Sequence, residues 1–269
     1  MLNKRETHQK RISTRAIIYS EPQSLNQPYH EKPNSNSFLS RLLKEFQEKS
    51  FQTIHPDIEV TGHSDQKKTL LIAVDGGANY LHEQEIIPDI VIGDMDSIKP
   101  ETLKYYRNLT EIKSYPARKN ETDTELALRW CLDNNNSAQT NMFIDEILFI
   151  NTLQGSFAHS LGILSLLFSA DEQGIGAEIC TDQETIFLLP EMWHCRGKIG
   201  TKISLISLTE KATGIETEGL EYPLCRETLF RNSTRGISNV FVDEEIRICY
   251  TSGRLLVIIE STLEDLTWK

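Results

Sequence analysis

The chain alternates between short apolar runs and stretches in which apolar residues recur at helical spacing. Runs with the length of a buried strand lie at residues 15–19, 69–74, 89–92 and 146–151. Helical spacing occurs at residues 38–49, from residue 78 onward, and at residues 100–108, 122–132 and 158–169. Strands that alternate with helices predict a mostly parallel sheet with helices on its faces.

The helical spacing ends near residue 176. Short strand-like runs separated by turns follow at residues 177–182, 185–190, 201–208, 214–222, 245–250 and 254–261. Such runs predict an all-β sandwich or barrel. We therefore expect three parts: a disordered basic tail (1–14), an α/β domain with a mostly parallel sheet (15–172) and a C-terminal all-β sandwich domain (176–269).

Composition narrows the class of protein. The chain has 39% hydrophobic and 25% charged residues, as ordinary globular proteins have. Its net charge of -11 argues against broad binding to nucleic acid, which needs a basic surface. The five cysteines are scattered and form no Cys-x-x-Cys pair, which favours reduced thiols in a cytoplasmic protein. No apolar run is long enough to span a bilayer, so we expect no membrane partner.

Acidic residues follow two of the predicted strands. The run at 69–74 leads into Asp75, Gly76 and Gly77, and the run at 89–92 leads into Asp94 and Asp96. Ligands of open α/β sheets bind beyond the carboxyl ends of the strands, and adjacent glycines let a ligand approach the backbone closely. These two strand ends are therefore candidates for one binding site.

A further carboxylate, Asp123, comes from the first turn of a predicted helix. Thr122 and Glu125 form a capping-box pattern at the start of that helix. Carboxylates gathered in one place repel each other unless a cation lies between them, and hard oxygen ligands suit Mg²⁺. Because Mg²⁺ bridges phosphate oxygens, the expected partner is a nucleoside polyphosphate.

Each of these features also has a simpler interpretation. Asp-x-Asp after a strand often only forms a turn, and Asp123 could merely be a favourable charge at a helix N-terminus. His159 lies beside apolar residues and could be a hydrogen-bonded core histidine. Tyr222 could be a half-buried tyrosine on a strand. The metal-site hypothesis is favoured because the acidic elements occur together at positions that fit one sheet edge.

The order of motifs resembles the thiamine pyrophosphokinase family. The motifs are DGGAN (75–79), PDIVIGDMDSI (88–98), TDTELAL (122–128), GLEYPL (219–224) and GISNVF (236–241). The resemblance implies an α/β catalytic domain and a β-sandwich that binds the vitamin, in a homodimer with its active site at the subunit interface. It also implies transfer of a diphosphate group from ATP to the thiamine hydroxyl, with Mg²⁺, giving thiamine diphosphate and AMP.

The resemblance assigns roles residue by residue. The catalytic and metal-binding residues are Asp94, Asp96 and Asp123. The nucleotide- and phosphate-binding residues are Asp75, Gly76, Gly77, Ser97, Lys119, Thr122, Gly155 and His159. The residues near thiamine are Tyr222, Ser238 and Asn239. An aromatic face suits a flat or cationic ring, and an amide can pair with ring nitrogens.

The chain departs from the family in two places. Where the family usually reads Gly-Gly-Arg-x-Asp-His, this chain has Gln154-Gly155-Ser156-Phe157-Ala158-His159, and Asn120 replaces a common Asp. The missing Arg is a bidentate phosphate donor that Ser cannot replace, although Arg118 and Lys119 could supply charge nearby. Two alternatives therefore stay open: a degenerate member that binds nucleotide or thiamine with little turnover, and another Mg²⁺-dependent phosphotransferase.

Overall fold

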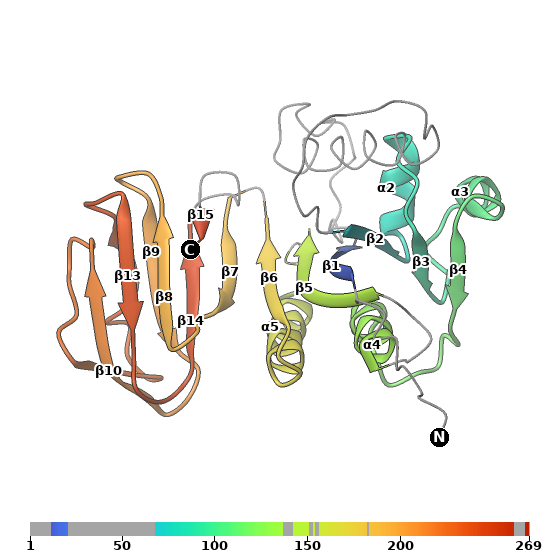
Figure 1. Cartoon of the computed structure of the whole chain (residues 1–269). Helices are drawn as coiled ribbons and strands as arrows, with labels where there is room; N and C mark the ends of the chain where they lie inside the picture. Colours follow the sequence, from blue (N-terminus) through green and yellow to red (C-terminus); the bar gives the residue numbers. More distant parts are fainter. Residues whose placement is uncertain are drawn as a thin grey trace, which may run out of the picture.

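A ten-stranded sheet runs through the molecule (Figure 1). The computed structural model describes residues 12–20, 68–136, 142–150, 153, 156–181, 183–260 and 267–268. The strands of this sheet are β1 (Ile12–Ser20), β2 (Lys68–Val74), β3 (Ile90–Gly93), β4 (Glu111–Ser114), β5 (Met142–Ile150), β6 (Gly176–Cys180), β7 (Thr185–Leu188), β9 (Lys202–Ser207), β12 (Asn239–Val240) and β14 (Leu255–Ile259). Their order in space is β12-β9-β14-β7-β6-β5-β1-β2-β3-β4.

The N-terminal part of the sheet is parallel and is covered on both faces. β6, β5, β1, β2, β3 and β4 pair in parallel, whereas β7 joins β6 antiparallel. The helices α4 (Asp123–Asn136) and α5 (Phe157–Asp171) lie on one face, and α2 (Gly77–Glu83) and α3 (Pro100–Tyr106) lie on the other (Figure 1). Neighbouring residues of β1 point into different cores, Ile18 toward α4 and α5 and Ile17 toward α2 and α3. Two covered faces explain why these strands read as continuous apolar runs.

The C-terminal region is a β-sandwich. A second sheet has the order β11-β10-β13-β8-β15. Its strands are β8 (Met192–Arg196), β10 (Lys211–Glu218), β11 (Glu227–Phe230), β13 (Glu245–Cys249) and β15 (Thr267–Trp268). A shared apolar core joins it to β7, β9 and β14, with Phe187 and Trp193 in contact across the two sheets. The predicted fold class, an α/β region followed by a β-sandwich, is confirmed.

Several boundaries differ from the sequence prediction. β1 begins at Ile12, inside the range expected to be a tail, because Thr14 is buried and paired with β5. α4 continues past the predicted helix end at residue 132 as far as Asn136, and the Asn135 amide bonds the backbone of Ile144. The expected helix at 38–49 lies outside the described residues. None of the described helices has the length and apolar character needed to cross a membrane.

The contact between the ends of β2 and β3 positions the residues that follow these strands. The Asp75 N–H donates to the Ile92 carbonyl at 2.9 Å. A Cβ at Gly93 would lie 2.9 Å from the Asp75 Cβ, closer than real Cβ atoms approach, and 3.2 Å from its Cα. Glycine is therefore required at position 93 to bring β3 against Asp75.

We predict that Gly93→Ala destabilises the protein by about 1–3 kcal/mol, because the added methyl group forces β3 and Asp75 apart. Gly162→Ala is the matched control: it lies within α5 with nothing within 4 Å of the new Cβ. Removing a glycine from a helix interior stabilises it by about 0.5–1 kcal/mol. Urea denaturation of both variants checks the two signs, and an unchanged midpoint for Gly93→Ala would contradict the close contact.

Candidate active site

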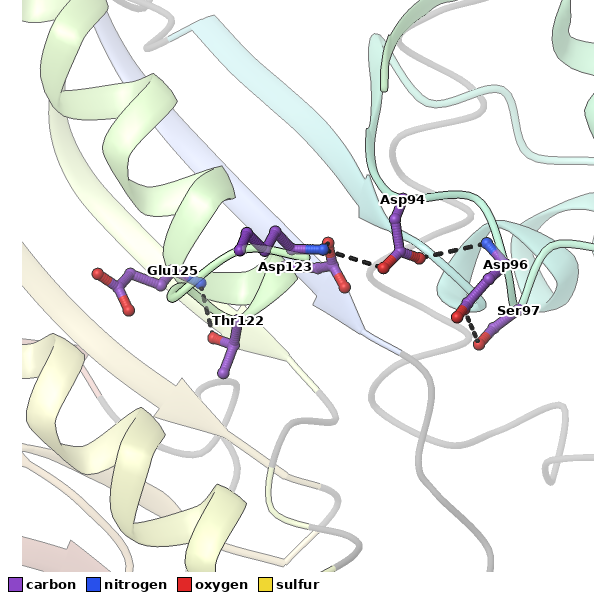
Figure 2. Close-up of polar contacts among 7 residues, drawn as sticks. Asp94, Asp96, Ser97, Thr122, Asp123 and Glu125 are labelled. Carbon is purple, nitrogen blue, oxygen red and sulfur yellow. Dashed lines mark hydrogen bonds and ion pairs between the residues drawn. The ribbon is translucent and has the colours of Figure 1, made fainter. Parts of the chain in front are cut away.

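Three carboxylates meet beyond the ends of β2 and β3. One oxygen from each of Asp75, Asp94 and Asp96 lies within 4.8 Å of the others. Asp75 follows β2, and the other two belong to a segment after β3, residues 94–99, which we call the acidic loop. Figure 2 shows Asp94 and Asp96 on this loop, with Asp123 at the start of α4 on the far side of Asp94. The sheet edge thus brings together Asp75, Asp94 and Asp96, whereas Asp123, one of the three expected metal ligands, lies beside this group and not within it.

Asp75 is held in an unfavourable environment. Its backbone is left-handed, with φ 41°, a conformation that costs free energy for a residue other than glycine. Burial raises the pKa of its carboxyl group above the ordinary value of 3.8, and the neighbouring Ser97 hydroxyl opposes this rise. The charges of the neighbouring aspartates raise the pKa further. In the described part of the chain, the buried Asp75 Oδ1 has no hydrogen-bond partner.

The acidic loop is shaped by bonds within it and by one residue of α2. The Asp96 N–H donates to Asp94 Oδ1 at 3.3 Å, and Ser97 Oγ donates to Asp96 Oδ1 at 3.0 Å (Figure 2). The buried Asn79 side chain donates to the Ser97 carbonyl at 2.9 Å. Sequence reasoning missed Asn79, although it is the last residue of the DGGAN motif.

Lys119 lies between two of the acidic residues. Its Nζ donates to Asp94 Oδ2 at 3.0 Å and lies 3.0 Å from Asp123 Oδ1. Desolvation lowers the pKa of Lys119, but its contacts with Asp123 and Asp94 outweigh this and raise it above 10.5. The hydrogen bond from Lys119 in turn lowers the pKa of Asp94 below 3.8. The ammonium group therefore neutralises part of the acidic charge.

The start of α4 has the predicted cap. Thr122 Oγ1 accepts a hydrogen bond from the Glu125 N–H at 3.2 Å (Figure 2), which confirms one half of the capping box. Asp123 is the first residue of the helix. The cap thereby sets the direction in which Asp123 leaves the helix, toward Lys119 and Asp94.

The two glycine-containing segments differ from each other. Gly76 and Gly77 stand directly before and at the start of α2, a helix of seven residues whose first turn is buried. In the other segment Gly155 lies outside the described residues. Ser156, which replaces the family's arginine, caps α5 by accepting from the His159 N–H at 3.4 Å. His159 is exposed, so the interpretation as a core histidine is wrong.

Residues assigned to the vitamin lie together in the β-sandwich. Tyr222 is 57% exposed, and its backbone N–H donates to Asn239 Oδ1 at 3.0 Å. Asn239 Nδ2 donates back to the Tyr222 carbonyl at 2.8 Å, and Asn239 Oδ1 also accepts from the Val240 N–H. Ser238 has a left-handed backbone, with φ 60°. The Asn239 amide thus holds the segment that presents the Tyr222 ring, so most of its bonding capacity is used within the protein.

The three carboxylates of Asp75, Asp94 and Asp96, which we call the acidic group, lie far from the Tyr222 segment of the same chain. Asn239 lies on β12, at one edge of the large sheet, and Asp75 follows β2 near the other edge. The path from β2 to β12 passes through β1, β5, β6, β7, β14 and β9. Seven steps of about 4.8 Å correspond to about 34 Å along the sheet. A small molecule held by Tyr222 cannot reach the carboxylates of its own chain.

The acidic group fits a divalent cation. Its donor atoms are carboxylate oxygens, the ligands that Mg²⁺ and Ca²⁺ prefer. The buried and unpartnered Asp75 Oδ1 is an oxygen for which the described residues supply no proton or cation. Asp75, Asp94 and Asp96 could therefore hold such an ion together.

Comparison with known proteins agrees with this geometry. Residues 62–179 match the thiamin pyrophosphokinase catalytic domain, and residues 194–255 match the thiamin pyrophosphokinase vitamin B1 binding domain. The thiamine pyrophosphokinase of Bacillus subtilis is 31% identical over 209 residues, 76% of this chain and 92% of the relative. Thiamine pyrophosphokinase 1 of Oryza sativa subsp. japonica is 28% identical, over 70% of this chain and 78% of the relative.

Solved structures share the fold. The Bacillus subtilis thiamine pyrophosphokinase structure has a TM-score of 0.66 at 23% identity and covers 93% of this chain and 99% of its own. The Candida albicans thiamin pyrophosphokinase has a TM-score of 0.67 at 18% identity, with 92% and 89% covered. These relatives do not favour either alternative, a degenerate binding protein or another phosphotransferase. The chain belongs to the thiamine pyrophosphokinase family, transferases that use ATP to convert thiamine to thiamine diphosphate.

Proposed function

We propose that this chain forms thiamine diphosphate and AMP at a Mg²⁺ site made by Asp75, Asp94 and Asp96. The observation that carries the proposal is the convergence of these three carboxylates, one with a buried oxygen to which no described residue supplies a partner. Asp123, a metal ligand by the family resemblance, is paired with Lys119 in this structure. We assign to Asp123 the task of orienting Lys119, and to Asp94 contact with both Lys119 and the metal.

The reaction is an in-line transfer. The thiamine hydroxyl oxygen forms a bond to the β-phosphorus of ATP while the bond from that phosphorus to the α,β-bridging oxygen breaks, and AMP leaves. The hydroxyl proton is released. A loose transition state of this kind needs positioning and charge neutralisation more than a strong base. When bound, Mg²⁺ supplies part of that neutralisation.

Residues of the chain supply the remaining charge neutralisation and the positioning of the substrates. Lys119 carries a full positive charge at neutral pH and is already held at the acidic group, so it can pair with phosphate oxygens that enter there. The acidic loop orients the metal-binding carboxylates, and the exposed ring of Tyr222 gives a flat surface for an aromatic or cationic ring. Ser156 caps α5 at the position where the family resemblance places an arginine. We therefore assign to Lys119 the positive charge that pairs with phosphate at this edge of the sheet.

We propose that two copies of the chain share each active site. Tyr222 and the acidic group are separated by about 34 Å along one rigid sheet, too far for one substrate to touch both. A second copy, related by two-fold symmetry, can place its Tyr222 segment over the acidic group of the first. We place this dimer in the cytoplasm, since Cys131, Cys180 and Cys195 are buried free thiols, as is usual in a reducing compartment.

The activity itself is tested by incubating the purified chain with thiamine, ATP and Mg²⁺. We expect thiamine diphosphate and AMP in equal amounts, and no product after chelation of the metal. Separation of the nucleotides by chromatography distinguishes AMP from ADP. Formation of ADP with a thiamine monophosphate would contradict diphosphate transfer.

Asp75→Asn should stabilise the metal-free protein at pH 7 and abolish metal binding. The folded-state pKa of Asp75 is raised, so its ionised form costs stability at every pH above that pKa. The cost disappears as the pH falls below the ordinary value of 3.8, where the carboxyl group is protonated in both states. The stability advantage of the variant should therefore shrink between pH 7 and pH 4, as measured by urea denaturation. An advantage that did not depend on pH would contradict this assignment.

Mixing two inactive variants tests the shared site. Asp94→Asn removes the acidic half, and Tyr222→Ala removes the vitamin half. In a random mixture, half of the dimers are mixed, and each has one site with both changes and one with neither. Activity should therefore recover to about one quarter of the wild-type value. No recovery after confirmed subunit exchange would show that both halves of a site come from the same chain.

A further inference from the structure

We infer that Asn79 is a positioning residue whose side chain holds the acidic loop in the shape that binds the metal. The inference rests on the proposed metal site. Asn79 itself makes no contact with substrate in this role and acts through the loop backbone. Neither the predicted site residues nor the family motifs assign it a task.

The side chain of Asn79 spans from α2 to the acidic loop. It is 6% exposed, and both ends of its amide bond the loop backbone. Nδ2 donates to the Ser97 carbonyl at 2.9 Å, and Oδ1 accepts from the Lys99 N–H at 2.9 Å. Two bonds from one planar group fix both the position and the orientation of the loop.

The loop needs such an anchor because its own charges favour opening. Asp94 and Asp96 lie near each other and near Asp75, and their mutual repulsion decreases if the loop moves away from β2. Met95, between them, has a left-handed backbone with φ 69°, which persists only where the surroundings impose it. The closed loop is therefore under both electrostatic and conformational strain.

Two other described contacts of the loop are weaker than the Asn79 bonds, whereas the Lys119–Asp94 ion pair at 3.0 Å fixes the Asp94 side chain and not the loop backbone. The hydrogen bond from the Asp96 N–H to Asp94 is long, at 3.3 Å, and stays within the loop. The Lys99–Glu83 ion pair joins the loop to α2, but both side chains are about half exposed, and such pairs add little. Ile98 packs in the apolar core shared with α2 and α3, and Asn79 supplies the buried polar attachment of the loop backbone.

The test compares Mn²⁺ binding, by electron paramagnetic resonance titration without nucleotide, in the full chain and its variants. Asn79→Ala should lower the affinity on the order of tenfold, as loss of a residue that orients metal ligands does. Asn79→Leu keeps most of the side-chain volume and loses both bonds, so it should show the same loss. Thermal unfolding of each variant reports the accompanying loss of stability.

Tyr106→Phe is the matched control. Tyr106 is buried in the same layer as α2, and its hydroxyl donates to the Ile86 carbonyl at 2.6 Å. The control should lower the unfolding temperature without changing Mn²⁺ affinity, because Tyr106 does not hold the acidic loop.

Wild-type affinity in folded Asn79→Ala or Asn79→Leu would overturn the inference. So would an equal loss of affinity in Tyr106→Phe, since any loosening of the layer would then be sufficient. Failure of both Asn79 variants to fold would assign the residue to folding and not to positioning. If the wild-type chain bound no Mn²⁺, the metal site itself would be wrong, a result distinct from the three above.

Discussion

Repulsion between like charges is the constraint around which the site is built. Three carboxylates, each with one oxygen within 4.8 Å of the others, repel one another unless a cation lies between them. Lys119 balances part of the charge, and Asn79 holds the loop that carries two of the carboxylates. Gly93 does not reduce the repulsion; it lets the two strand ends approach closely enough for the cluster to form. Left-handed backbone at Asp75 and Met95 adds a conformational cost of the kind that is found at functional sites.

The large sheet decides which residues can cooperate. Parallel strands with helices on both faces give way to antiparallel strands without a break in hydrogen bonding, through the β6–β7 pair. The two regions are therefore joined by a rigid sheet and not by a flexible linker. A fixed distance between the acidic group and the Tyr222 segment follows, and this distance is the basis of the proposal that two chains share each site.

The sequence was sufficient to predict the elements that are buried on both sides. The runs of β1, β2, β3 and β5 are apolar because both of their faces are covered, so their composition alone indicates them. β4 was missed because it reads Glu-Ile-Lys-Ser and lies at the sheet edge with partly exposed residues. The sequence also did not predict that one sheet runs through both regions. An antiparallel strand such as β7 has the same hydrophobic pattern whether it extends the parallel sheet or belongs to a separate one.

In the site, too, features that stand out in the local sequence were predicted, and features that depend on contacts between distant residues were not. The aspartates were found because charges directly after apolar strands stand out in the sequence. The roles of Gly93 and Asn79 depend on contacts with residues about 18 positions away, and the pattern around each residue does not report such contacts. Asn239 was expected to face a ligand, but its amide hydrogen-bonds the Tyr222 backbone. The residue type allows either use, and only the neighbouring backbone in the fold shows which one is made.

The number of strands in the ten-stranded sheet sets the distance between the acidic group and the Tyr222 segment. If the site is shared, the strands between β2 and β12 set the spacing between two half-sites that serve different partners in the dimer. Loss or gain of one strand there would change that spacing by about 4.8 Å, more than the length of a hydrogen bond. In a shared site of this kind, the number of intervening strands such as β7 and β14, which carry no proposed site residue, would be constrained by the chemistry at both ends.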